Sequence, residues 1–188
     1  MSGKLIIFSA PSGSGKTSIV RKIMQKHSDF TFSISATTRS KRPNEEQDKD
    51  YFFMSINDFQ NKIAENAFVE WQMVYENCYY GTLKSEVEAM LNNGINVLFD
   101  VDVLGGLNIK KIYGSKALAI FVQPPSIETL TERLLLRQTE TPETLAKRIA
   151  KAEYEMSFLR HFDAVITNDD LDTAVEKSEE LILNFLNK

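Results

Sequence analysis

The chain has 188 residues, which is enough for one sizeable hydrophobic core and too few for two ordinary domains. Hydrophobic residues make up 43% and charged residues 26%, no apolar run approaches the roughly 20 residues of a membrane helix, and the N-terminus lacks the long apolar stretch of a signal peptide. The net charge of −4 argues against a broad nucleic-acid surface, and the single cysteine, Cys78, excludes an internal disulfide. We therefore expect a cytoplasmic protein without membrane or nucleic-acid partners, in which any phosphate-binding charge is local.

Four apolar runs bounded by turn residues have the length and composition of buried strands. They are KLIIFSA (4–10), INVLFDVD (95–102), ALAIFVQPP (117–125) and DAVITN (163–168). Helical patterns fill the intervals between them. This alternation predicts an α/β fold in which helices flank a parallel sheet.

Several helix boundaries can be predicted from their terminal residues. A helix begins at Thr17, behind a glycine-rich turn, and Gly94 ends a later helix because glycine adopts a left-handed cap at little cost. Ser126 precedes IETLTERLLLR as an N-cap, and Thr141 with Pro142 opens the helix PETLAKRIAKAEYEM.

The segment of residues 35–83 differs in character from the rest of the chain. It is rich in aromatic and β-forming residues, and a short helical pattern lies near residues 56–65. We therefore expect a small mixed α/β lobe inserted into the parallel core.

The stretch FSAPSGSGKTS (8–18) nearly matches the phosphate-binding pattern GxxxxGK[ST]. A strand, a glycine turn and a helix start in this order surround a polyphosphate with backbone N–H groups. Lys16 would neutralise the β- and γ-phosphate oxygens, and Thr17 would hold Mg²⁺. The pattern predicts ATP contacts by Ser12, Gly13, Ser14, Gly15, Lys16, Thr17 and Ser18.

The position of the first glycine in this pattern is occupied by Ala10. Pro11 biases its predecessor toward extended backbone angles, which alanine tolerates, so position 10 need not have a positive φ. Gly13 and Gly15 lie where the backbone must approach phosphate closely, and we expect these two glycines to be required.

A second oxygen ligand for the metal is expected at Asp100, which ends NVLFD as a Walker B aspartate would. The expected cofactor is Mg²⁺ bound with ATP, without a tightly bound organic cofactor. The alternative to a metal ligand at Asp100 is an aspartate that caps a neighbouring loop. The alternative to the phosphate loop itself is a glycine turn that contains a lysine by chance. A phosphate loop alone serves kinases, GTPases, ATPase motors and sulfotransferase-like enzymes, so other residues must select the reaction.

The run SISATTRSKRPNEEQDKDYFF (33–53), followed by FVEW, NCYYGT and FDVD, resembles the guanylate kinase family in order and spacing over most of the chain. The resemblance implies a P-loop NTPase fold and an enzyme that transfers the γ-phosphoryl group of ATP to GMP, and also to dGMP. It implies a single domain with a core of residues 1–34, 84–126 and 152–188, a GMP-binding lobe of 35–83 and a helical lid of 127–151.

The resemblance also implies a set of GMP-binding residues, which are Ser35, Arg39, Arg42, Glu45, Tyr51, Glu70, Tyr80, Thr82 and Asp102. Guanine presents N1–H and N2–H₂ donors, which a carboxylate at Glu70 would accept together. Adenine would place its N1 lone pair against that carboxylate, so GMP should exclude AMP. The alternative is that Glu70 is a surface residue of a strand.

The phosphate of GMP is expected between Arg39 and Arg42, with the hydroxyls of Tyr51 and Tyr80 completing the clamp. This arrangement would explain basic residues within an acidic protein. Simple packing of the lobe is the alternative interpretation of the two tyrosines.

Arg133 and Arg137 lie on one helix face, where like charges repel unless an anion lies nearby. This segment resembles the lid of the family, and Arg148 also matches. The expected catalytic residues are Lys16, Arg39, Arg133, Arg137 and Arg148, which would stabilise charge on the transferred phosphoryl group. The alternative is that these arginines lie on a solvated helix face and bind no ligand.

Asn168, in VITNDDLDTA, matches the loop that lies beside the adenine of ATP in the family. A helix N-terminus capped by Asp169 or Asp170 would explain the same sequence segment without a ligand.

The chain departs from the family pattern at Asn44, Asp48, Leu104 and Gln138, which affects loop geometry more than chemistry. Two rival functions are a non-catalytic guanylate-kinase-like binding module and a kinase of a phosphorylated sugar. The sequence leaves the oligomeric state open.

Overall fold

The computed structural model describes residues 2–136 and 141–187. Over these residues the chain forms two compact units. One unit contains Leu5–Phe30 and the chain from Leu98 onward, and is called the core unit below. The other contains Thr31–Val97 and the described residues before Leu5, and is called the mixed unit.

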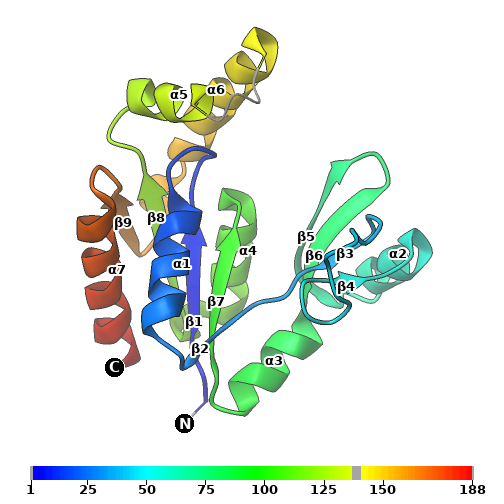
Figure 1. The fold of residues 1–188 in the computed structure, drawn as a ribbon. Coiled ribbons are helices and arrows are strands. Elements are labelled where there is room, and N and C mark those ends of the chain that lie inside the picture. Colours follow the sequence, from blue (N-terminus) through cyan, green and yellow to red (C-terminus); the bar gives the residue numbers. More distant parts are fainter. Residues whose placement is uncertain (1, 137–140, 188) are drawn as a thin grey trace. The chain divides into compact units, whose positions relative to one another are not determined.

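A five-stranded sheet has the order β2-β7-β1-β8-β9 (Figure 1). Its strands are β1 (Leu5–Ser9), β2 (Phe30–Phe32), β7 (Asn96–Val101), β8 (Ala117–Gln123) and β9 (Ala164–Thr167). β1 pairs in parallel with β8, and β8 pairs in parallel with β9. The four strands expected from apolar runs are confirmed, whereas β2 was not predicted.

Helices cover both faces of this sheet (Figure 1). Ile6 and Phe8 of β1 belong to the cluster that contains buried residues of α1 (Lys16–Lys26) and α7 (Leu171–Leu186). Alternate strand residues point to opposite faces, and Ile7 and Ser9 lie against Gly106 of α4 (Val103–Tyr113). All five residues of β1 are buried because both faces are covered. Short 3₁₀ helices follow at Gly114–Lys116 and Leu159–His161.

Two further helices of the core unit, α5 (Ile127–Leu135) and α6 (Pro142–Met156), pack together through Leu130, Leu134 and Ala152. Their predicted caps are confirmed. The Ser126 side chain accepts a hydrogen bond from the Thr129 N–H, and Thr141 forms a reciprocal capping box with Thr144.

The mixed unit contains a four-stranded sheet of order β4-β3-β6-β5. Its elements are β3 (Ala36–Thr37), β4 (Phe52–Phe53), α2 (Ile56–Ala64), β5 (Phe68–Tyr75), β6 (Cys78–Leu83) and α3 (Lys84–Asn92). β3 pairs in parallel with β4 and antiparallel with β6, so strands of both directions occur in this sheet. Ala36, Phe59, Phe68 and Leu83 form its core. The unit extends beyond residues 35–83 at both ends and includes α3.

Positive φ angles mark the tight turns of the mixed unit. Gly94 has a φ of 76° just after α3, which confirms the predicted left-handed end. Asn77, in the turn between β5 and β6, has a φ of 57°, and Asp48 has a φ of 64°. Asp48 therefore holds a backbone conformation that glycine would adopt with less strain. Within the described part of the chain, no helix has both the length and the apolar character needed to cross a bilayer.

Candidate active site

The turn between β1 and α1 has the backbone of a phosphate loop. Gly13 and Gly15 have φ angles of 97° and 83°, which side-chain-bearing residues rarely adopt, whereas Ala10 does not have a positive φ. The φ angles agree with the expected difference between Ala10 and the two glycines, and the requirement for both glycines stays a prediction. Gly15 is the N-cap of α1, and no described side chain caps this helix end. Its first N–H groups are therefore oriented to receive an acceptor from outside the helix, as in anion sites.

Lys16, Thr17 and Asp100 meet beside this turn. The Lys16 Nζ lies 2.6 Å from the Asp100 Oδ1 and donates to the Val101 carbonyl oxygen at 2.5 Å. The Thr17 hydroxyl donates to the Asp100 Oδ2 at 3.0 Å. The phosphate loop joins the end of β1 to the start of α1, and Asp100 lies near the end of the neighbouring strand β7. The carboxyl ends of two adjacent strands therefore bring these side chains together.

The oxygens of Thr17 and Asp100 fit a site for Mg²⁺. Mg²⁺ prefers hard oxygen ligands and is usually held by one or two protein groups together with water and phosphate oxygens. The two oxygens lie 3.0 Å apart, and Lys16 balances the carboxylate charge. Among the described residues there is no cluster of three or more His, Cys, Asp or Glu side chains that could hold a metal ion.

A cavity of about 360 Å³ opens on the phosphate loop within the core unit. Its polar lining comes from the loop and the start of α1, from residues at and just after the end of β7, and from one face of α6. The lining includes Ser12, Lys16, Thr17, Ser18, Asp100, Asp102, Arg148, Lys151 and Glu155. The Arg148 Nη1 donates to the Ser12 hydroxyl at 3.0 Å, so this predicted lid arginine adjoins the phosphate loop.

Lys151 and Glu155 were not predicted as site residues. With Arg148 they follow a spacing of three and four residues, which places them on one face of α6, and this spacing was visible in the sequence. Glu155 is buried, and that burial raises the pKa of its carboxyl group although the Lys151 Nζ lies 3.6 Å away. The face therefore brings two cations and one buried acid to the cavity.

Arg133 and Asn168 form a contact beside the phosphate loop. The Arg133 Nη2 donates to the backbone oxygen of Asn168 at 3.0 Å, and the Asn168 Nδ2 donates to the Ser14 carbonyl oxygen at 2.7 Å. Asn168 is only 5% exposed. Its expected place beside adenine stays a prediction, and the structure adds a contact with the loop itself. Arg137 lies outside the described residues.

Gly15→Ala is expected to weaken Mg·ATP binding by at least about tenfold, because a left-handed backbone costs a non-glycine residue roughly 1–2 kcal/mol and the turn would distort. An added Cβ would also lie 2.2 Å from the Asn168 Nδ2. Isothermal titration calorimetry with ATP and Mg²⁺ measures the effect. Ala10→Gly is the matched control and should bind as the unmodified protein does; equal losses in both variants would contradict the assignment of the two positions.

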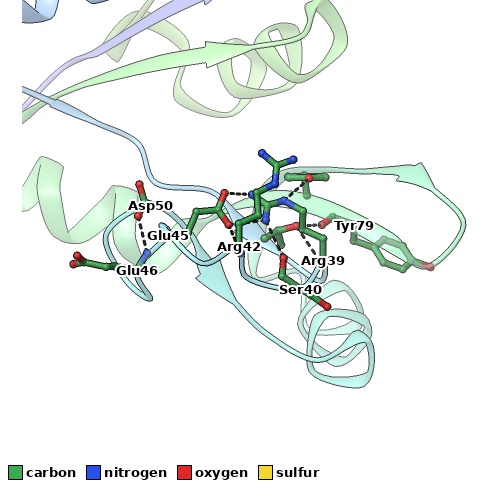
Figure 2. A network of polar contacts seen from close by, with 9 residues as sticks. Arg39, Ser40, Arg42, Glu45, Glu46, Asp50 and Tyr79 are labelled. Carbon is green, nitrogen blue, oxygen red and sulfur yellow. Dashed lines mark hydrogen bonds and ion pairs between the residues drawn. The ribbon is translucent and has the colours of Figure 1, made fainter.

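A second polar cluster surrounds Arg39 in the mixed unit (Figure 2). The Arg39 guanidinium donates from Nη1 and Nη2 to the two carboxylate oxygens of Glu45, at 2.7 and 2.5 Å, and from Nε to the Tyr80 hydroxyl at 3.1 Å. Its carbon lies 4.9 Å from the centre of the Tyr51 ring. The Arg42 backbone N–H also donates to Glu45. The structure thus brings together five of the residues predicted to bind GMP.

Glu45 is expected to stay ionised in acid. Its hydrogen bonds from the Arg39 side chain and the Arg42 backbone lower its pKa from 4.5 to about 2. A lowered pKa stabilises the fold fully above pH 4.5, and this contribution is lost as the pH falls from 4.5 toward 2. A ¹³C NMR titration of the Glu45 carboxylate should show a midpoint near 2. A midpoint near 4.5 would mean that the Arg39 pair does not persist in solution.

Glu70 and Thr82 face each other across the β5–β6 pair. The buried Thr82 hydroxyl donates to the Glu70 Oε1 at 2.7 Å, so the carboxylate is fixed in orientation. Ser35 precedes β3, and its carbonyl oxygen accepts from the Phe52 N–H. Asp102 belongs to the core unit, where its Oδ1 caps α4 by accepting from the Gly105 N–H at 2.7 Å. This capping role was not predicted.

Comparisons with known proteins agree with the geometry. A family model described as guanylate kinase matches residues 2–184. The guanylate kinase of Bacteroides thetaiotaomicron is 54% identical over 188 residues, which are 100% of this chain and 92% of that protein. The guanylate kinase of Porphyromonas gingivalis is 48% identical over 186 residues, with 98% and 99% of the two chains covered.

The fold has a counterpart among solved structures. The crystal structure of guanylate kinase from Anaplasma phagocytophilum matches with a TM-score of 0.73 and 23% sequence identity, over 97% of this chain and 86% of that one. This match and the helix-flanked parallel sheet confirm the predicted P-loop NTPase fold. The matched residues include the phosphate loop and both polar clusters. The chain therefore belongs to the guanylate kinase family and is a nucleoside monophosphate kinase.

Proposed function

We propose that the chain is an ATP:GMP phosphotransferase that forms ADP and GDP and also accepts dGMP. The observation that carries this proposal is the contact among Lys16, Thr17 and Asp100 at the phosphate loop. This triad supplies a cation for phosphate oxygens and two oxygens for a metal ion. The names of the relatives support GMP as the acceptor.

The core unit would bind the triphosphate of ATP. The uncapped start of α1 directs N–H groups outward, and Lys16, Arg148 and Lys151 line the adjoining cavity. In phosphoryl transfer the protein acts by positioning and by stabilising charge, because the reaction needs little covalent chemistry from side chains. These three cations would therefore stabilise the negative charge on the transferred phosphoryl group.

Thr17 and Asp100 would hold Mg²⁺ through their side-chain oxygens. When bound, the metal ion would neutralise charge on the phosphate oxygens. Lys16 is paired with Asp100 in the structure and would exchange part of this contact for a phosphate oxygen. Asp100 thereby keeps its charge balanced with and without nucleotide.

The mixed unit would bind GMP. Glu70, oriented by Thr82, offers the carboxylate that suits the N1–H and N2–H₂ donors of guanine. Arg39, held in place by Glu45 and Tyr80, would contact the GMP phosphate together with Arg42. Because that phosphate is already anionic, the acceptor needs no strong general base.

A coupled assay of ADP formation tests the proposal with GMP, dGMP, AMP, UMP and ribose bisphosphate as acceptors. Turnover with GMP and dGMP is expected, and AMP should react at least about 10⁴-fold less efficiently. Equal use of AMP, or no GDP, would contradict the proposal. No turnover together with no ATP binding in calorimetry would favour a binding module, and turnover with ribose bisphosphate would favour a sugar kinase.

A further inference from the structure

Asn168 lies between β9 and α7, behind the phosphate loop. The residue is 5% exposed, and its side-chain amide nitrogen donates to the Ser14 carbonyl oxygen at 2.7 Å in a buried hydrogen bond. Its own backbone N–H donates to the Gln123 carbonyl oxygen at the end of β8. The amide is thus anchored to the sheet and directed at the loop.

The fit between Asn168 and the loop leaves no room for another side chain. A Cβ atom added to Gly15 would lie 2.2 Å from the Asn168 Nδ2, which is closer than carbon and nitrogen approach without a bond. Gly15 also needs its positive φ of 83° to present the start of α1. The Asn168 side chain therefore packs directly against the turn that would bind the phosphates.

The same loop is held by α5, whose place beside the β1–α1 turn can be followed in Figure 1. A Cβ at Gly13 would lie 3.3 Å from Leu134 and 3.4 Å from Leu130, so these two leucines pack against the loop. The Arg133 Nη2, on the same helix, donates to the Asn168 backbone oxygen. Asn168 consequently joins α5 to the phosphate loop through polar contacts, accepting from Arg133 and donating to Ser14.

We infer that Asn168 is a positioning residue for the phosphate loop, which holds the Ser14–Gly15 turn in its phosphate-binding shape and joins it to Arg133. The kinetic part of this inference rests on the proposed function. The observation behind it is that the side-chain amide of Asn168 donates a buried hydrogen bond to the loop. Without the Asn168 amide, the buried Ser14 carbonyl oxygen would lose this hydrogen-bond donor, which favours rearrangement of the turn.

Inorganic tripolyphosphate with Mg²⁺ separates this role from a contact with adenine, because the probe has no base. Asn168→Ala should weaken its binding about tenfold in calorimetry, and weaken Mg·ATP by the same factor. Weakened ATP binding with unchanged tripolyphosphate binding would overturn the inference in favour of a base contact. Unchanged binding of both probes would also overturn it. This test needs neither GMP nor turnover, so a failure of the proposed function would leave it intact.

Two further variants serve as controls. Asn168→Leu nearly keeps the side-chain volume but removes the hydrogen-bond donor, so it can replace the alanine variant if that variant folds poorly. It should show the same loss of about tenfold in tripolyphosphate binding. Asn93→Ala is the matched control, since the exposed Asn93 also donates its amide nitrogen to a backbone oxygen, that of Ala89 at 2.9 Å. Its tripolyphosphate affinity should be unchanged; a similar loss there would contradict a role specific to Asn168.

A double-mutant cycle and steady-state kinetics complete the test. Gly15→Ala combined with Asn168→Ala should bind tripolyphosphate no more weakly than Gly15→Ala alone, because the second change removes the 2.2 Å contact. Independent, multiplied losses would contradict the inference. In turnover, Asn168→Ala should raise the KM for ATP and leave the KM for GMP unchanged, whereas a merely structural role would lower kcat with both KM values unchanged.

Discussion

Replacing Lys16 with Met is expected to lower the kcat of GDP formation by about 10² to 10³-fold, the usual effect of losing one donor that stabilises developing charge. The Nζ of Lys16 lies 2.6 Å from Asp100, which also accepts from Thr17, and Lys16 lines the cavity beside the phosphate loop. Met keeps the length of the apolar stem but cannot neutralise phosphate oxygens. Steady-state kinetics with saturating ATP and GMP measures the loss.

The control for this variant is Lys22→Met on the same helix. Lys22 is 40% exposed in its side chain and pairs with Asp172, away from the phosphate loop. Its replacement should change kcat little. If Lys16→Met retained more than half of the unmodified kcat, or if Lys22→Met were equally damaged, the assignment of Lys16 to the transferred phosphate would be wrong.

Glu70→Gln is expected to lower kcat/KM for GMP by roughly 100-fold, because an amide turns one donor group toward the donors of guanine and loses the charge that strengthens each bond. Gln can still accept the hydrogen bond from the Thr82 hydroxyl, so the β5–β6 pair should persist. The activity with AMP should fall much less. The ratio of kcat/KM values for GMP and AMP is therefore the quantity to measure.

Glu65→Gln is the control for this second variant. Glu65 is an exposed residue at the C-terminal end of α2 in the same unit, and it has no expected contact with a nucleotide. The change should leave the GMP to AMP ratio unaltered. An unaltered ratio in Glu70→Gln as well would mean that another group reads the guanine base.

The core of the fold could be predicted because its signals are local. The strand β1 is an unbroken apolar run and is buried on both faces, and Ser126 and Thr141 cap their helices through bonds to residues only three positions away. β2 escaped prediction because it has three residues, of which only Phe30 is buried. An edge strand of this length leaves no periodic pattern.

The candidate site could be predicted in part, for physical reasons. The meeting of Thr17 with Asp100 follows from a general rule, since parallel strands place their carboxyl ends at one edge. The bidentate pair of Arg39 and Glu45 forms within a loop, where no periodicity reports which charges meet. The buried bond from Asn168 to Ser14 spans 154 positions and has no signal in the sequence pattern.

Following the label of γ-³²P-ATP incubated with Mg²⁺ and GMP tests phosphoryl transfer most directly. After separation of the nucleotides, the label should lie in GDP, with one ADP formed for each labelled GDP, and Lys16→Met should slow this transfer by the factor given above. Omission of GMP should leave the label in ATP. Label released as inorganic phosphate at the same rate with and without GMP would contradict a phosphotransferase and indicate an ATPase.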